Sequence, residues 1–239
     1  MEQNSFKKGI VDGLPICVGY FAVSFAFGIF AVGQGLTWLE AVLISVTNLT
    51  SAGQLAGVPI IAGGGTFAEL AVSQLVINSR YSLMSVSLSQ KLSGKVKLWQ
   101  RFIIAFGNTD EIFAVATANP GLVGSRYMYG LIITPVLGWS GGTLLGAVAG
   151  DILPAIVVTS LGVAIYGMFI AIVVPQIKRE RSAAVCAGIA VALSCAFYFV
   201  PALSKVPSGF TIIICAIAAA LIAALLFPLP RKEGAADDK

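Results

Sequence analysis

The sequence predicts an all-α polytopic membrane protein. Of its 239 residues, 57% are apolar and only 11% are charged, and the mean hydropathy is +0.92, values well outside those typical of soluble domains. Apolar segments recur from residue 14 to residue 228 without a long polar stretch, so no soluble catalytic or nucleic-acid-binding domain has room to fold. Short clusters of lysine and arginine separate the segments, as charges that orient membrane helices do. One membrane domain in contact with lipid is expected, and no nucleic acid is implied.

The residue types limit the chemistry that the chain can perform. It contains no histidine, and its four cysteines lie inside apolar runs without paired spacing. It lacks the H-E-x-x-H and G-x-S-x-G patterns of metal- and serine-dependent hydrolases. We therefore expect no metal site, no cofactor and no enzyme activity, with an intramembrane enzyme as the least favoured alternative. Any proton relay would depend on carboxylates.

The first half of the chain is expected to comprise a cytoplasmic lead, residues 1–13, and a membrane repeat, residues 14–118. Asp12, which precedes Pro15, is interpreted as the cap of the first helix. Three full spans are expected in this repeat, at residues 14–32, 66–88 and 102–118. Between the first two, the segment at residues 38–62 is long enough to cross ~30 Å of hydrocarbon but is polar in its middle.

The second half is expected to have a similar layout. A connecting loop at residues 119–126 leads to a second membrane repeat, residues 127–228, which is followed by a cytoplasmic tail, residues 229–239. Its three full spans are expected at residues 127–148, 183–200 and 210–227. The segment at residues 152–177 is interrupted in the same way as the segment at residues 38–62.

A ridge of glycines with i, i+4 spacing lies along one face of the span at residues 127–148. Small residues at this spacing let a second helix backbone approach closely. The neighbouring helix belongs either to this chain or to a second subunit, and the sequence is compatible with both. The ridge consists of Gly138, Gly142, Gly146 and Gly150.

Five polar side chains and a glycine interrupt the segment at residues 38–62, in the stretch Thr47–Gln54. Such groups are tolerated in a bilayer core where they line a protein-enclosed cavity, so we interpret the stretch as a broken helix at a solute site. The alternative is that these side chains only make contacts within and between packed helices. A similar Thr-Ser-x-Gly pattern follows 109 residues later. The candidate substrate-binding residues at the two breaks are Asn48, Thr50, Ser51, Gln54, Thr159 and Ser160.

Three charged residues lie well inside the second and third spans of the first repeat: Arg80, Asp110 and Glu111. If these spans form an antiparallel hairpin, Arg80 and Asp110 both lie roughly 14 to 15 Å from the basic loop between them, and they are expected to meet. One arginine against two carboxylates leaves an excess negative charge that a proton could neutralise. This favours a proton-coupling site. The alternative is a buried ion pair that only stabilises the fold.

Charge and spacing predict an inverted repeat. Four basic clusters should all face the cytoplasm, at residues 7–8, 91–101, 178–181 and 231–232. This requires the segments at residues 38–62 and 152–177 to enter and return as re-entrant hairpins from opposite sides. The expected architecture is two halves of inverted topology, with six full spans and two broken or re-entrant helices, as in secondary transporters. Both termini are then cytoplasmic.

Several motifs, spread over most of the chain, occur together in one known family. They are Pro15-Ile16, Gly19-Tyr20, Phe25-Ala26-Phe27-Gly28, Ser45, Ala52-Gly53-Gln54, Asn78, Arg80, Thr109-Asp110-Glu111, Phe113-Ala114 and the glycines from 142 to 150 before Pro154. On these residues the chain resembles the AzlC family, the large subunit of bacterial branched-chain amino acid exporters. The resemblance implies proton-driven export of leucine, isoleucine, valine or similar amino acids across the inner membrane. It also implies a small membrane subunit of the AzlD type as partner.

The resulting hypothesis is a secondary transporter that exports branched-chain or similar hydrophobic amino acids. A transporter or channel for another small solute is the alternative. If the chain exports amino acids, backbone N–H groups at the start of the half-helix near Ala52 would bind the substrate carboxylate. Side-chain oxygens of Asn48 and Gln54 would accept hydrogen bonds from its ammonium group.

Overall fold

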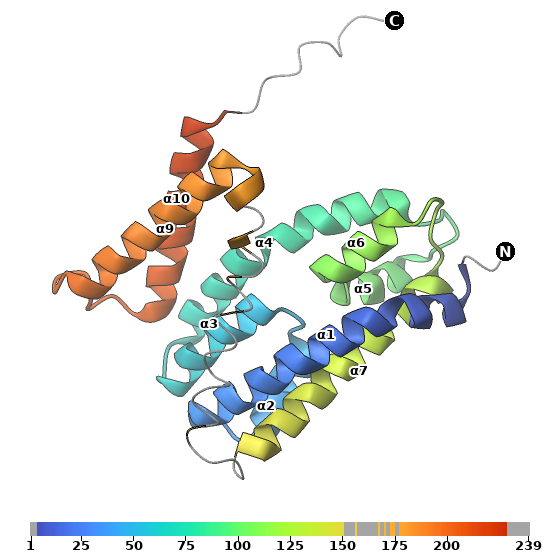
Figure 1. The fold of residues 1–239 in the computed structure, drawn as a ribbon, viewed down its shortest axis with the longest axis horizontal. Helices are drawn as coiled ribbons and strands as arrows, with labels where there is room; N and C mark the ends of the chain where they lie inside the picture. The colour runs from blue at the N-terminus through green and yellow to red at the C-terminus, as the bar shows by residue number, and fades with distance from the viewer. Residues whose placement is uncertain are drawn as a thin grey trace, which may run out of the picture. The chain divides into compact units, whose positions relative to one another are not determined.

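The computed structural model describes residues 4–150, 156, 167, 170, 173–174 and 177–228. Within these ranges every regular element is a helix (Figure 1), which confirms the predicted all-α class. The chain divides into two compact units, Met1–Phe169 and Ile170–Lys239, and each is described by itself.

Three long helices frame the first unit: α1 (Phe6–Gly33), α4 (Phe67–Lys91) and α7 (Ser125–Gly150). Each has at least 25 residues, so at about 1.5 Å per residue each can cross the hydrocarbon core of a bilayer. α1 and α7 are also apolar enough to be candidate membrane spans, whereas α4 carries more polar side chains. The spans expected at residues 14–32, 66–88 and 127–148 are thus confirmed as helices, each longer than expected.

Asp12 does not cap α1, so that expectation is wrong. The helix begins at Phe6, where the Ser5 side chain accepts a hydrogen bond from the backbone N–H of Lys8. Asp12 lies inside the helix, forms an ion pair with Lys8 one turn earlier and accepts a hydrogen bond of 2.9 Å from the Tyr127 hydroxyl. The carboxylate therefore connects α1 to α7 near their N-terminal ends.

α1 and α7 lie side by side and run parallel, and their backbones touch through glycines on both helices (Figure 1). Gly9 lies against Gly130 near the start of the pair, and Gly28 lies against Gly146 near its end. A Cβ atom on Gly146 would stand 1.9 Å from the carbonyl oxygen of Phe25, a distance at which no side chain fits. The predicted glycine ridge therefore packs against a helix of this chain. We call this contact the glycine seam.

The parallel direction of α1 and α7 bears on the predicted inverted repeat. Two halves of opposite topology, with a boundary at residues 119–126, would place the first helix of each half in opposite directions. The inverted repeat of these two halves, and the count of six full spans, are therefore not confirmed. Most of the second interrupted segment, residues 152–177, lies outside the described residues.

The segment at residues 38–62 is broken, as predicted. α2 (Trp38–Thr47) and α3 (Ser51–Ala62) are separated by three non-helical residues. A capping box formed by Thr37 and Glu40 starts α2. The Thr50 hydroxyl starts α3, because it accepts a hydrogen bond of 2.9 Å from the backbone N–H of Gly53.

The span expected at residues 102–118 is also broken, and the expectation of a continuous helix there is wrong. α5 (Leu98–Phe106) and α6 (Asp110–Ala118) are separated by Gly107, Asn108 and Thr109. Gly107 permits close contact with α7, because a Cβ atom there would lie 2.3 Å from Cγ2 of Ile132. Thr109 is the N-cap residue of α6, and two carboxylates follow in its first turn, where the helix dipole favours negative charge.

α5 begins and α6 ends at the same end of the first unit. The backbone N–H of Ser93 donates to the Val123 carbonyl at 2.9 Å, and the Val123 N–H donates to the Lys91 carbonyl at 3.0 Å. The chain before α5 therefore touches the chain after α6. The Asn4 side chain also bonds to the backbone of this connection, so the start of α1 lies there too. We call this the basic end, after Lys91 and its neighbours in the loop at residues 91–97.

The two broken segments are hairpins that enter from opposite ends. α1 begins and α4 terminates at the basic end, and α2 follows α1 whereas α3 precedes α4. Both ends of the α2–α3 hairpin therefore lie at the far end, and both ends of the α5–α6 hairpin lie at the basic end. The hairpins begin 60 residues apart, at Trp38 and Leu98, and their breaks contain Asn48 and Asn108, also 60 residues apart.

Cysteine labelling tests this arrangement. In a chain whose four native cysteines are replaced, Ser93→Cys and Leu122→Cys should react with an impermeant thiol reagent from one side of the membrane, and Gln34→Cys from the other. A full crossing at residues 98–118 would place Ser93 and Leu122 on opposite sides. Labelling of these two positions from opposite sides would thus contradict the re-entrant hairpin.

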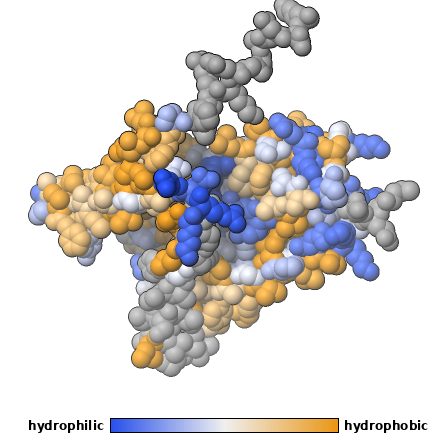
Figure 2. Space-filling model, turned by 45° about the horizontal axis from the view of Figure 1, so that its top comes forward, coloured by the Kyte–Doolittle hydropathy of each residue, from blue (hydrophilic) through white to orange (hydrophobic). Residues whose placement is uncertain are grey.

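The second unit contains α9 (Arg181–Phe199) and α10 (Ser208–Leu226), which pack against each other. Both are candidate membrane spans, which confirms helices near residues 183–200 and 210–227. Large apolar side chains are exposed on the helices of both units, and Figure 2 shows apolar surface over much of the visible face. These are the properties of a multi-pass membrane protein.

Candidate functional site

Two neighbouring cavities lie beside the break between α2 and α3, and they share Thr47 and Asn48. The aliphatic cavity, of about 170 Å³, is lined in part by Ile44, Val58, Ile61 and Leu70. The inter-break cavity, of about 200 Å³, is lined in part by Thr50, Asn78, Tyr81, Asn108 and Thr109. Together they reach the lower end of the size range of small-molecule sites, roughly 300 to 1,000 Å³. The inter-break cavity joins the two breaks, which sequence reasoning did not bring together.

A network of side-chain amides holds the first break against α4. Gln74 of α4 donates from Nε2 to the carbonyl oxygen of Gly53 at 2.8 Å. Its Oε1 accepts from Nδ2 of Asn48 at 3.2 Å and from Nδ2 of Asn78 at 3.1 Å. Asn48, predicted as a substrate ligand, thus uses its amide nitrogen to fix the break. Gln74 was missed, although it lies one turn before Asn78 on the same helix face.

Gln54 ties the break to α2 and, through Ser45, to α7. Its side chain is 1% exposed, and its Nε2 donates to the Asn48 carbonyl at 2.6 Å and to Oγ of Ser45 at 3.3 Å. The Ser45 hydroxyl is in turn 2.7 Å from that of Thr143 on α7. Oε1 of Gln54 is buried without a hydrogen-bond partner in the described part of the chain. Gln54, predicted as a substrate ligand, therefore uses its amide nitrogen to hold the break, and its amide oxygen has no partner among the described residues.

The start of α3 offers backbone donors beside these cavities. Thr50 accepts from Gly53 N–H and lines the inter-break cavity, whereas Ser51 lines a narrow space next to Gln54 and Trp139. Among the described residues, nothing accepts from the N–H groups of Ser51 and Ala52. Thr159 and Ser160, predicted on the other side of the site, lie outside the described residues.

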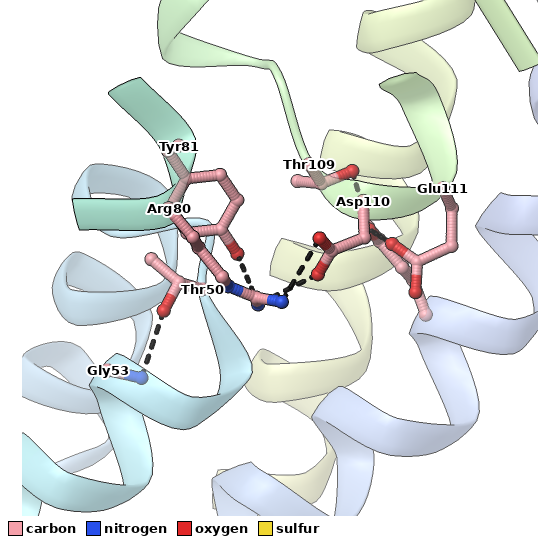
Figure 3. Close-up of polar contacts among 8 residues, drawn as sticks. Thr50, Gly53, Arg80, Tyr81, Thr109, Asp110 and Glu111 are labelled. Carbon is pink, nitrogen blue, oxygen red and sulfur yellow. Dashed lines mark hydrogen bonds and ion pairs between the residues drawn. The ribbon is translucent and has the colours of Figure 1, made fainter. Parts of the chain in front are cut away.

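Arg80 and Asp110 meet across the second break, as their expected depths required. Nη1 of Arg80 is 3.1 Å from Oδ1 of Asp110, and Nη2 is 2.7 Å from Oδ2, a bidentate pair between α4 and the start of α6. Nη2 also donates to the Tyr81 hydroxyl at 3.1 Å. Figure 3 shows the guanidinium extended from α4 toward Asp110. The two side chains are 51% and 45% exposed, so the protein does not bury this pair by itself.

Glu111 does not share Arg80 with Asp110. Its carboxylate accepts a hydrogen bond from the Tyr20 hydroxyl of α1, which also lies 2.7 Å from Oγ1 of Thr109. The Tyr20 ring packs edge-on against Trp139 of α7, with ring centroids 5.1 Å apart. The first turn of α6 is therefore held to α4 by one carboxylate and to α1 by the other.

Sequence comparison places these residues in a known family. A family model described as AzlC protein matches residues 15–153, which is more than half of the chain. The chain belongs to the AzlC family. The matched range of this AzlC-family protein includes both breaks, the amide network and the charged residues, and it covers most of the glycine seam.

Three relatives of this AzlC-family chain are informative. A protein of Archaeoglobus fulgidus, named only as an uncharacterized membrane protein, is 32% identical over 191 residues, which is 79% of this chain and 84% of the relative. The inner membrane protein YgaZ of Escherichia coli is 30% identical over 198 residues, 80% of each chain. The branched-chain amino acid transport protein AzlC of Bacillus subtilis is 22% identical over 180 residues, 74% of this chain and 70% of the relative. No solved structure matches the chain.

Proposed function

We propose that this AzlC-family protein is a secondary transporter that exports branched-chain or similar hydrophobic amino acids. The observation that carries the proposal is the pair of adjoining cavities at the first break, which bring aliphatic side chains such as Leu70 close to polar groups such as Asn48 and Asn78. A zwitterion with an apolar side chain needs both kinds of surroundings inside a membrane. The name of the Bacillus subtilis relative supports the same class of substrate.

In this proposal the carboxylate of the substrate binds at the start of α3. The N–H groups of Ser51 and Ala52 have no partner in the described ranges, and the positive end of the helix dipole favours an anion there. Thr50, the residue before them, and Asn48 line the inter-break cavity, whereas Ser51 lines a narrow space beside Gln54. The apolar side chain of the substrate would then extend into the aliphatic cavity, past Gln54.

Proton coupling is assigned in this proposal to the two carboxylates at the start of α6. Protonation of Asp110 removes its attraction to Arg80, and protonation of Glu111 ends its role as an anionic acceptor for Tyr20. Either event loosens the attachment of α6 to a neighbouring helix. A proton gradient would thereby act on the second hairpin, which borders the inter-break cavity.

The proposal also includes a small AzlD-type membrane subunit and an inner-membrane location with both termini in the cytoplasm. The partner follows from the family resemblance. The orientation is supported by Lys7, Lys8 and the 91–101 loop, since basic residues accumulate on the cytoplasmic side of membrane proteins. These residues lie toward the basic end of the first unit.

Transport in proteoliposomes tests the proposal. Vesicles that contain this chain, with and without the small subunit, should take up labelled leucine with saturation, and an imposed pH gradient should increase the rate. A channel for small solutes would instead give a flux that rises linearly with leucine concentration. Linear flux, or no leucine transport with the small subunit present, would rule out the transporter.

A change at Gly57 tests the aliphatic cavity. A methyl group there would lie 3.2 Å from Nε2 of Gln74 and 3.4 Å from Cδ1 of Leu70, so it fits after a small adjustment and narrows the cavity. Gly57→Ala should raise the half-saturating concentration of leucine about tenfold and that of alanine much less. Gly19→Ala is the matched control, because its new methyl group would touch nothing within 4 Å. Equal effects on leucine and alanine would show that the side chain of the substrate does not bind in the aliphatic cavity.

A further inference from the structure

Two residues that line the inter-break cavity carry buried carbonyl oxygens to which no described residue donates. Oδ1 of Asn78, on α4, and Oδ1 of Asn108, in the second break, are both buried, and no described residue donates to either. Both residues line the inter-break cavity, and Asn108 is only 3% exposed. Buried acceptors are nearly always paired in folded proteins, so these two oxygens indicate a ligand that supplies donors.

The orientation of the Asn78 amide follows from a chain of hydrogen bonds that begins at a backbone carbonyl. The Gly53 carbonyl can only accept, so the Gln74 amide must present its nitrogen there and its oxygen toward Asn78. Asn78 must then present its nitrogen to Gln74, which leaves its buried oxygen without a donor among the described residues. Nδ2 of Asn108 lies 3.4 Å from Oγ of Ser85, a hydroxyl that can accept this bond or donate to an amide oxygen. Asn78 therefore holds an unpaired acceptor beside the cavity, and Asn108 holds a second one when its nitrogen bonds to Ser85.

We infer that Asn78 and Asn108 bind the α-ammonium group of the amino acid substrate. This inference rests on the proposed function and refines the position of the ammonium group. An ammonium has three donors and no acceptor, which matches two carbonyl oxygens, whereas a carboxylate would be repelled by them. Thr50, the N-cap residue of α3, lines the same cavity, so the start of α3 proposed for the carboxylate lies next to the space beside which the ammonium group would bind.

This assignment differs from the one that the sequence favoured, which gave the ammonium group to Asn48 and Gln54. Gln54 does not line the inter-break cavity, whereas Asn48 does, and its side-chain oxygen remains a third acceptor there because its nitrogen bonds to Gln74. Gln54 lines the aliphatic cavity instead, and its Oε1 is buried without a hydrogen-bond partner in the described part of the chain. The second break, which the sequence reading treated as continuous helix, supplies one of the two ammonium ligands.

The test compares leucine with 4-methylpentanoate, which is leucine without its amino group. Binding is measured by competition against labelled leucine on the purified chain with its small subunit in lipid nanodiscs. Wild-type protein should bind leucine about ten- to hundredfold more tightly than 4-methylpentanoate. Asn78→Leu and Asn108→Leu should reduce this preference to a few-fold while the affinity for 4-methylpentanoate is unchanged. Gln90→Leu, an exposed amide on α4, is the matched control and should keep the full preference.

The outcomes separate this inference from the proposed function. If wild-type protein binds no branched-chain amino acid, the proposed function fails. If it binds leucine but both asparagine variants keep the full preference, or lose both ligands equally, the asparagines do not bind the ammonium group. Asn108→Asp retains an oxygen at the same position and should retain the preference for leucine. Loss of this preference in Asn108→Asp would also overturn the assignment. A Na⁺ dependence of leucine binding that disappears in Asn78→Leu, with the preference intact, would show a metal-ion site instead.

Discussion

Gly146→Ala is expected to destabilise the folded protein by about 3 kcal/mol, although it adds a single methyl group. The new Cβ atom would stand 1.9 Å from the carbonyl oxygen of Phe25 and 2.7 Å from its carbonyl carbon. These are backbone atoms that cannot rotate away, so α1 and α7 must move apart along the glycine seam. The measurement is the temperature at which the detergent-solubilised variant loses its monodisperse peak in size-exclusion chromatography.

Gly141→Ala is the matched control for this experiment. Gly141 lies on the same helix, five residues earlier, and a Cβ atom there would meet nothing within 4 Å. Alanine is favoured over glycine in a helix interior by up to about 1 kcal/mol, so this variant should be as stable as the wild type or slightly more stable. If both variants lose the peak at the same temperature, the two backbones are not in contact at Gly146.

Asp110→Asn is expected to remove the dependence of transport on the proton gradient and to lower the gradient-driven rate by about tenfold or more. The asparagine cannot take up a proton, and it leaves the Arg80 guanidinium without its bidentate partner. Arg80→Lys should also impair transport, because an ammonium group does not reproduce the two parallel hydrogen bonds of the guanidinium. Leucine uptake at several imposed pH gradients measures both effects. Glu111→Gln shows in the same assay whether the second carboxylate carries the proton instead.

Two further variants decide whether this ion pair is functional or structural. Asp12→Asn breaks the other ion pair of the described chain, with Lys8 in the first turn of α1, and should leave the pH dependence unchanged. The exchange of Arg80 and Asp110 in one double variant restores the attraction but moves the titratable group to α4. Normal pH-dependent transport by the exchanged variant would show that only the attraction between the helices matters.

The sequence predicted the first break because polar side chains stand out in an apolar segment. Thr50 followed by Gly53 is a helix start, and the structure uses both residues for that purpose. The second break carried a comparable signal, since Thr109 precedes two acidic residues. It was missed because Asp110 and Glu111 were read as charges inside a span. The position of these two carboxylates directly after Thr109, an N-cap residue, is the local signal that a helix begins there.

Other features of the site depend on residues that are distant in the chain. Small residues at i, i+4 spacing predicted that α7 contacts a helix closely, but only the fold shows that α1 is this helix. Gln74 gains its importance from the Gly53 carbonyl, 21 residues earlier, and no local pattern reveals such a partner. The free oxygens of Asn78 and Asn108 are likewise visible only once every neighbouring donor has been placed.

The glycine seam also determines which parts of a transporter built this way are able to move. Side chains can exchange neighbours when two helices slide, but α1 and α7 meet backbone to backbone, so sliding would drive carbonyl groups into one another. These two helices therefore form a stator. The tip of the α5–α6 hairpin is held by side-chain contacts, which are easier to break and remake: one ion pair, the hydrogen bonds of Tyr20, the bond of Asn108 to Ser85 and the packing of Ile132 against Gly107. In an alternating-access cycle of the proposed transporter, this tip would be the gate, and α1 and α7 would form the fixed surface against which it opens and closes.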